Sequence, residues 1–203
     1  MVKRFYTSVS TGQTEAGFFV ALDANRLKTP ANRTLDLPTW ALAKAVAEEW
    51  EAQDEEILPA AMPIMRLVAT AVDHVGHALD ATVASFVEYA GSDMLLYRAE
   101  TPAKLMQHQE ENWSQILAWA QKRFDLVFNV TNGVLPVDQP AGNAARLAKI
   151  AGRDVFRVSG LAHGAALLGS AILTLALEAE EISAERAHAL SSLDALFQID
   201  EWG

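Results

Sequence analysis

The N-terminal part of the chain shows the alternation of apolar and polar residues that is typical of short β-strands. Residues 3–10 (KRFYTSVS) and 17–23 (GFFVALD) are rich in aromatic and β-branched side chains. Between them, Thr-Gly-Gln at residues 11–13 is expected to form a turn. Two further runs alternate apolar and polar residues and end on prolines: residues 25–30 (NRLKTP) and 33–38 (RTLDLP). Proline suits strand ends and sheet edges. The pattern predicts a small antiparallel sheet over residues 2–37.

Helical periodicity begins after residue 38. Thr39 is a candidate N-cap for a helix. Behind it, Leu42, Val46 and Trp50 form one apolar stripe, and the glutamates around them, Glu49 included, are expected to face solvent. This helix should cover one face of the sheet, because a sheet with an apolar face must bury it.

Two prolines in residues 56–63 (EILPAAMP) interrupt this helix. We place the domain boundary there, with an N-terminal domain at residues 1–60 and a C-terminal domain at residues 61–203. Helical periodicity dominates the second domain. The expected helices cover residues 64–75, 79–90, 102–124, 142–151, 154–178 and a last segment from about 184. The predicted fold class is α+β: a small N-terminal antiparallel β-rich domain followed by a C-terminal orthogonal helical bundle.

One expected helix, at residues 154–178, is unusually apolar. Residues 158–177 (VSGLAHGAALLGSAILTLAL) carry no formal charge over a length that can span a bilayer. However, the run contains glycine, serine and threonine, and it has no aromatic belt. We interpret His163 within it as a core histidine with satisfied hydrogen bonds. We therefore predict one fully buried central helix and no stable membrane insertion.

Composition narrows the classes of partner and chemistry. The 203 residues include 26 acidic and 16 basic ones, for a formal net charge of −10. This charge disfavours nucleic acids, whose phosphates are bound by lysine and arginine. The absence of cysteine excludes disulfides, thiolate catalysis and iron–sulfur clusters. The start, MVKRFY, lacks the apolar segment of a secretory signal. We expect a monomer in the bacterial cytoplasm, or in the mitochondrial matrix if the source is eukaryotic.

Candidate catalytic and metal-binding residues are few. His74 and His77 lie three residues apart on one expected helix, but their acidic neighbour Asp73 is oriented elsewhere by its position. The acidic runs lie on polar faces, without an apolar pocket that would raise a carboxyl pKa. No nucleophile, base and oxyanion donor occur in a pattern typical of catalysis. We therefore expect no enzymatic activity, no metal and no cofactor.

Arg66 is unusual because it lies among apolar residues, on a helix that is expected to be mostly buried. Asp73 follows two helical turns later on the same face, and Asp93 is a second candidate partner. The first interpretation is a structural ion pair. The second is a contact with a binding partner, since arginine and tryptophan are enriched at binding hot spots. A small enzyme or ligand-binding protein that uses an inter-domain cleft around Arg66, Asp73 and Asp93 is the alternative function.

Several stretches from one end of the chain to the other carry a family resemblance. They are KRFY (3–6), LDANRLKTP (22–30), AEEWEAQDEEILPAAMPIMRLVATAVD (47–73), SDMLLYRAE (92–100), GSAILTLAL (169–177) and LDALFQIDEWG (193–203). With them, the sequence resembles the assembly chaperones of the α subunit of F-type ATP synthase. The resemblance implies a small N-terminal α/β domain, a C-terminal helical bundle and no enzymatic activity. It also implies binding of newly made α subunit until the β subunit takes its place.

The closing stretch resembles the family's acidic, tryptophan-containing C-terminal motif. The resemblance marks a partner-binding patch of Asp194, Gln198, Asp200, Glu201 and Trp202. The chain has Ala195 where the family often has glutamate, and Asp200 where glutamate is usual. These departures point to a patch rather than to one indispensable carboxylate. The alternative is that Trp202 folds back on the helical bundle and the acids only solvate it.

Trp50 and Arg66 complete the predicted partner-binding residues. Both lie in the long central stretch that carries the most specific part of the resemblance. A third hypothesis is a membrane-associated assembly factor that uses residues 158–177 as its anchor. We rank the chaperone first, the enzyme second and the membrane-associated factor third.

Overall fold

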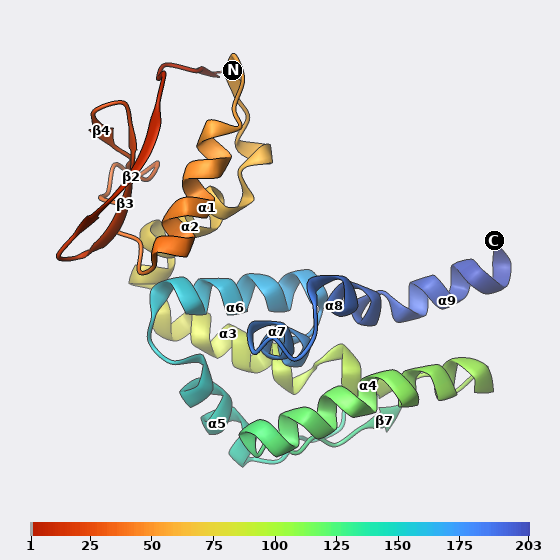
Figure 1. Ribbon diagram of the computed structural model, residues 1–203. Helices are drawn as coiled ribbons and strands as arrows, with labels where there is room; N and C mark the ends of the chain where they lie inside the picture. Colours follow the sequence, from red (N-terminus) through yellow and green to blue (C-terminus); the bar gives the residue numbers. More distant parts are fainter. Residues whose placement is uncertain (1) are drawn as a thin grey trace. The chain divides into compact units, whose positions relative to one another are not determined.

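The computed structural model describes residues 2–203, except for the side chain of Trp202. The chain forms two compact units, the first ending at Leu79 and the second covering Asp80–Gly203 (Figure 1). The first contains most of the strands, and the second is mainly helical. The predicted α+β fold class is confirmed.

A three-stranded antiparallel sheet forms the centre of the N-terminal unit, in the order β2 (Val9–Thr14), β3 (Gly17–Leu22) and β4 (Asn25–Arg26). The turn predicted at residues 11–13 is wrong, because these residues lie inside β2 and the chain turns at residues 15–16. Gly12 has a packing role instead of a turning role. A Cβ atom there would lie 2.4 Å from the Phe19 ring on the opposite strand, so glycine lets the ring cover the backbone.

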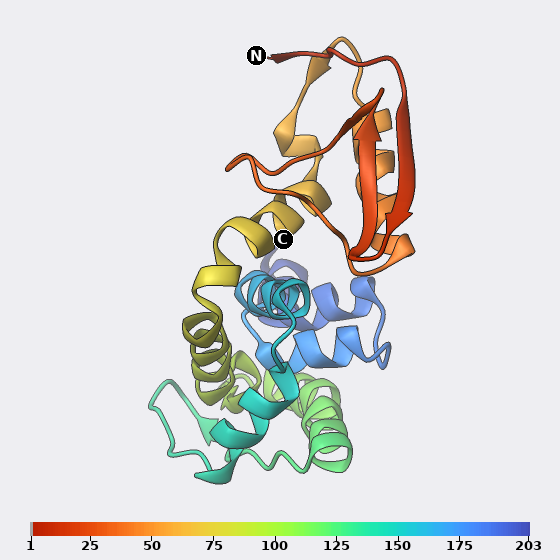
Figure 2. The same cartoon turned by 90° about the vertical axis from the view of Figure 1, so that its left-hand side faces the viewer.

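Helix α1 (Trp40–Glu51) covers one face of this sheet (Figures 1 and 2). The predicted N-cap is confirmed, since Thr39 Oγ1 accepts a hydrogen bond of 3.2 Å from the backbone N–H of Leu42. Val46 is fully buried between helix and sheet. A second, two-stranded pair joins the N-terminal β1 (Val2–Lys3) to β5 (Glu56–Ile57) in antiparallel fashion.

Helix α2 (Pro63–Asp73) packs on α1, which places it in the N-terminal unit. It follows the short 3₁₀ turn η1 (Pro59–Ala61) and precedes η2 (Val75–His77). Glu49 does not simply face solvent, as expected, because its carboxylate accepts hydrogen bonds of 2.7 Å from the N–H groups of Ile64 and Met65. The division between the units therefore lies at Leu79, beyond the prolines at which we expected it.

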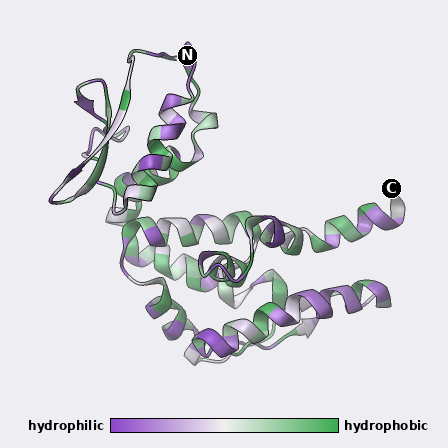
Figure 3. Cartoon of the chain, in the orientation of Figure 1, coloured by the Kyte–Doolittle hydropathy of each residue, from purple (hydrophilic) through white to green (hydrophobic). Residues whose placement is uncertain are grey.

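Within the described residues, the C-terminal unit is built mainly from seven helices. They are α3 (Leu79–Gly91), α4 (Ala103–Phe124), α5 (Gly142–Ala151), α6 (Val155–Leu168), α7 (Ala171–Glu178), α8 (Ala184–Ser191) and α9 (Leu193–Trp202). The 3₁₀ turn η3 (Met94–Leu96) leads into β6 (Tyr97–Arg98), which pairs in parallel with β7 (Thr131–Asn132). Figure 3 shows that the N-terminal half of α4 is mostly hydrophilic.

The single central helix predicted at 154–178 is wrong, because two helices occupy this segment. Gly169 ends α6 with a positive φ of 64°, a conformation that favours glycine, and Ser170 caps α7 by accepting from the N–H of Leu173 at 2.9 Å. Only α7 is buried on nearly all sides. His163 on α6 is exposed, so its interpretation as a core histidine is also wrong. None of the described helices combines the length and the apolar character that crossing a membrane requires.

Candidate functional site

Helix α9 carries the predicted C-terminal patch and contacts the rest of the C-terminal unit along a narrow apolar stripe. Leu193 and Phe197, one helical turn apart, are buried and hold the helix against the rest of the C-terminal unit. The other side of the helix is exposed. We call these exposed residues the C-terminal surface: Leu196, Gln198, Ile199, Asp200 and Glu201. The surface combines two acidic side chains with two large apolar ones, of which Ile199 is 61% exposed.

Asp194 has a structural contact rather than a free carboxylate. It accepts a hydrogen bond of 2.8 Å from Gln109 Nε2, and the buried Gln109 in turn accepts from the N–H of Ala99 at 2.7 Å. Asp194 therefore fastens the start of α9 to α4. The side chain of Trp202, expected from the sequence either in the partner-binding patch or packed on the bundle, lies outside the described residues.

A hollow of about 330 Å³ lies between α4 and α9 beside the C-terminal surface. Lys104 on α4 forms an ion pair with Glu201 across it, and this pair raises the pKa of the lysine. The Lys104 amino group also lies 5.6 Å from the centre of the Phe197 ring. Asp200 borders the same hollow and makes no ion pair within the described chain. Of the two terminal acids, Asp200 is thus the one without an ion pair, although its negative charge also contributes to the raised pKa of Lys104.

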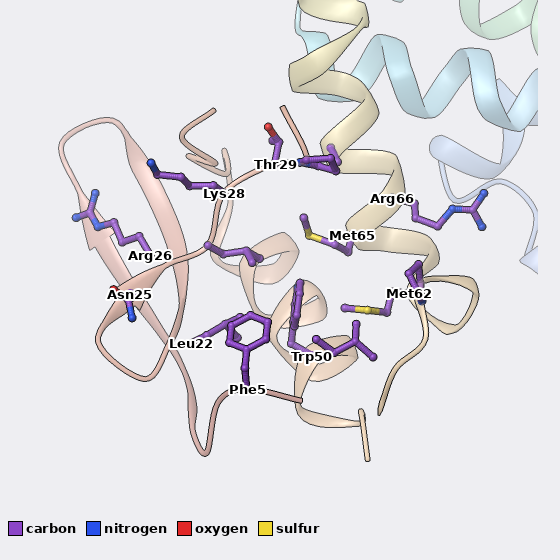
Figure 4. A pocket seen from close by; sticks show the side chains of 15 residues that line it. Phe5, Leu22, Asn25, Arg26, Lys28, Thr29, Trp50, Met62, Met65 and Arg66 are labelled. Carbon is purple, nitrogen blue, oxygen red and sulfur yellow. The ribbon is translucent and has the colours of Figure 1, made fainter. Parts of the chain in front are cut away.

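The structure places Trp50 and Arg66 at one pocket of the N-terminal unit, which we call the N-terminal pocket. It has a volume of about 470 Å³, within the range of ligand-binding cavities (Figure 4). Its walls are mainly apolar and come from the sheet, from α1 and from α2. The lining residues include Phe5, Leu22, Leu27, Trp50, Ile57, Met62 and Met65.

Trp50 is a half-buried wall residue with one unsatisfied polar atom. Its ring lies edge to face with Tyr6 at 5.6 Å, and its carbonyl accepts a hydrogen bond of 2.6 Å from the Tyr6 hydroxyl. Burial raises the pKa of this hydroxyl. The indole Nε1 of Trp50 is buried and has no hydrogen-bond partner among the described residues. A buried donor without an acceptor costs stability, so its presence at a pocket wall is notable.

The structural ion pair predicted for Arg66 is wrong. Arg66 is exposed and makes no ion pair within residues 2–203. Asp73 instead accepts a hydrogen bond of 2.6 Å from the Thr29 hydroxyl and lies 3.9 Å from Arg33. The hydrogen bond from Thr29 is the largest cause of the lowered pKa of the Asp73 carboxyl. Asp93 is fully buried in the C-terminal unit with its own hydrogen-bond donors. These three residues therefore do not form one polar group.

Sequence reasoning missed Arg26 and Lys28, which also line the N-terminal pocket. The pattern predicts a strand over this segment, and residues 22–30 also carry the family resemblance, but neither assigns a binding role to the two cations. The signal for them was the spacing: two cations two residues apart lie on the same side of an extended chain, and both are exposed while Leu27 between them is buried. Among the described residues, no group of three acidic or histidine side chains is placed to hold a metal ion.

Comparison with known proteins places these surfaces in a family context. The sequence model of the ATP12 chaperone protein family matches residues 3–121. The mitochondrial protein atp12 of Schizosaccharomyces pombe is 21% identical over 214 residues, which cover 99% of this chain and 74% of that protein.

Solved structures extend the similarity to the whole chain. Atp12 from Paracoccus denitrificans is 40% identical with a TM-score of 0.93, covering 100% of this chain and 87% of that chain. The Atu1473 protein from Agrobacterium tumefaciens is 36% identical with a TM-score of 0.95, covering 99% and 76%. Because the family model matches more than half of the chain, this protein belongs to the ATP12 chaperone family, and the resemblance of its sequence to ATP synthase assembly chaperones is confirmed.

Proposed function

We propose that this protein binds the free α subunit of F-type ATP synthase and keeps it from aggregating until the β subunit takes its place. The observation that carries the proposal is membership of the ATP12 family, together with similarity to solved Atp12 over the full chain. A subunit without its neighbours exposes apolar surface that is normally buried, and such surface associates wrongly. Binding without catalysis is enough to prevent this.

Two features of the described residues support a binding role. The C-terminal surface leaves Leu196 and Ile199 exposed beside Asp200, and the N-terminal pocket is apolar with Trp50 in its wall. Exposed apolar residues rimmed by charge are typical of protein interaction sites. We place the protein in the bacterial cytoplasm or the mitochondrial matrix, a proposal supported by the mitochondrial relative.

The proposal is tested by light scattering of isolated α subunit. We expect near-stoichiometric wild-type protein to suppress the rise in scattering. The variant Asp200→Lys with Glu201→Lys should suppress it much less, because like-charge repulsion would replace attraction at the C-terminal surface.

A matched control reverses two exposed acids elsewhere, Glu180→Lys with Glu181→Lys, and should behave as wild type. Circular dichroism checks that both variants fold. If wild-type protein leaves the scattering of the α subunit unchanged, the proposed function is wrong. If the Asp200 and Glu201 variant protects as well as wild type, the function stands and the C-terminal surface is not its site.

A further inference from the structure

The N-terminal pocket has the chemistry of a receptor for one class of side chain. Met62 and Met65 form part of its wall, and methionine adapts its shape to different apolar partners. Phe5 at the pocket is 67% exposed, a large apolar side chain left without cover. The cavity of about 470 Å³ can hold a bulky apolar side chain with part of its neighbours.

The charged residues at this pocket all have one sign. Arg26, Lys28 and Arg66 line it, all three are exposed, and no aspartate or glutamate lines it. Figure 4 shows that the charged ends of these three side chains point outward from the cavity, so the positive charge lies at its rim. This is unusual in a chain with a net charge of −10.

The three cations also lack carboxylate partners. Within the described residues of the N-terminal unit, Arg4, Arg33 and Lys44 form ion pairs. The cations without an ion pair there are Lys3, Arg26, Lys28 and Arg66, and three of these four line the pocket. The Arg26 guanidinium lies 4.0 Å from the centre of the Phe19 ring, whereas Lys28 and Arg66 form neither a ring contact nor an ion pair within the described residues. The rim of the apolar cavity thus carries positive charge without a carboxylate partner, which is complementary to an acidic partner.

The unsatisfied indole Nε1 of Trp50 is an independent observation at the same pocket. Nearly all buried donors in proteins have an acceptor, either a protein atom, an ordered water or a ligand atom, and no protein atom of the described residues accepts from this one. An occupant with oxygen acceptors close to its apolar group, such as a peptide backbone, would suit this donor.

We propose that the N-terminal pocket binds a short polypeptide segment of the client in which a bulky apolar side chain is flanked by aspartate or glutamate. The apolar side chain enters the cavity between Trp50 and the two methionines, and the flanking carboxylates meet Arg26, Lys28 and Arg66. This proposal rests on the proposed chaperone function, because that function makes the occupant a polypeptide.

The test is fluorescence anisotropy with labelled peptides and the full-length protein. One probe has a phenylalanine–leucine pair flanked on each side by two aspartates, and its counterpart carries lysines instead. A set of 12-residue peptides covering the α subunit shows which natural segments bind. We expect binding of the aspartate-flanked probe, at least about tenfold weaker binding of the lysine-flanked one, and an affinity that falls as salt is raised.

Two variants separate charge from shape. The triple reversal Arg26→Glu, Lys28→Glu and Arg66→Glu should weaken binding of the acidic probe at least about tenfold. The substitution Ala69→Phe fills the pocket from α2 without changing its charge and should have a similar effect. The control reverses three exposed cations of the C-terminal unit that form no ion pair, Lys122→Glu, Arg123→Glu and Lys149→Glu, and should leave binding unchanged.

Three outcomes overturn the proposal. The first is equal affinity for the aspartate-flanked and lysine-flanked probes, and the second is a triple-reversal variant that binds the acidic probe as tightly as wild type. The third is a protein that binds the fatty acid laurate but none of the peptides. The scattering assay keeps the two proposals apart. If wild type protects the α subunit and the triple reversal protects equally, the pocket proposal fails and the function stands. If wild type does not protect, the proposed function fails whatever the peptides show, and a client segment from the α subunit is excluded.

Discussion

Asp93 joins the starts of two helical elements inside the C-terminal unit. Its oxygens accept hydrogen bonds from the N–H of Leu95 at 3.1 Å, the hydroxyl of Ser170 at 2.9 Å and the N–H of Ile172 at 3.0 Å. The residue is fully buried, and burial raises the pKa of its carboxyl from 3.8 to about 6 although these donors oppose the shift. One aspartate thus places the start of α7 against η3, at the cost of burying a charge near neutral pH.

The raised pKa of Asp93 predicts a pH-dependent stability. Between pH 4 and 6 the folded state binds a proton that the unfolded state has released, so the free energy of unfolding contributed by Asp93 falls as pH rises through this range. The pKa of Asp93 differs by about two pH units between the folded and unfolded states, which corresponds to about 3 kcal/mol in the free energy of unfolding. Well above pH 6 the contribution is constant, because both states are then ionised.

Urea unfolding of wild type and Asp93→Asn, from pH 4 to pH 7, measures this effect. The difference between the two proteins isolates Asp93 from other carboxyls, such as Asp73, whose pKa is lowered and whose contribution has the opposite sign. We expect the wild-type advantage to shrink between pH 4 and 6 and then to level off. An advantage that stays constant over the whole range would contradict the prediction. If Asp93→Asn does not fold, the carboxyl can be titrated directly by NMR in the wild type.

At the scale of elements, the start of α2 depends on a side chain from α1. Two N–H groups in the first turn of α2 donate to the carboxylate of Glu49. The preceding residue, Met62, makes no capping hydrogen bond with its side chain. We predict that Glu49→Ala lowers the free energy of unfolding by about 1–3 kcal/mol, since it leaves two donors without their charged acceptor.

The neighbouring glutamate is a matched control for Glu49. Glu48 is exposed and forms only an i,i+4 ion pair of 3.6 Å with Lys44, so Glu48→Ala should cost less than about 0.5 kcal/mol. Urea denaturation followed by circular dichroism measures both. Equal losses for the two variants would show that the contact between α1 and α2 does not stabilise the fold.

Sequence reasoning succeeded where local signals decide the structure. The Thr39 cap and the helix at 142–151 follow from a capping residue and from helical periodicity within one segment. It failed where contacts with distant residues decide. Gly12 looked like a turn residue because its partner Phe19 lies on the next strand, and the apolar run around Gly169 did not reveal that Asp93 favours a new helix start there.

The same limit applies to the candidate sites. Trp50 and Arg66 were selected from the sequence, but their joint pocket with Arg26 and Lys28 depends on packing between strands and helices that are separated by tens of residues. Asp194 was selected with the terminal acids, although its carboxylate holds α9 to Gln109. Residue type indicated binding chemistry, whereas the structure was needed to separate free charges from satisfied ones.

At the scale of the whole molecule, the two candidate surfaces belong to different units of one chain. The N-terminal pocket is basic at its rim, and the C-terminal surface carries Asp200 and Glu201. The two surfaces therefore suit different segments of a client, one acidic and one basic. Two weak contacts on one chain give a stronger combined affinity, because the second contact forms at a high effective concentration.

This division predicts how mutations at the two surfaces combine. If one client contacts both, the triple reversal at the pocket and the double reversal Asp200→Lys with Glu201→Lys should each weaken binding of the α subunit at least about tenfold. Together they should weaken it about a hundredfold or more, since sites that share no residues or partners contribute independently. Surface plasmon resonance with immobilised α subunit measures the four affinities. A combined variant no weaker than the worse single variant would mean that only one of the two surfaces contacts the client.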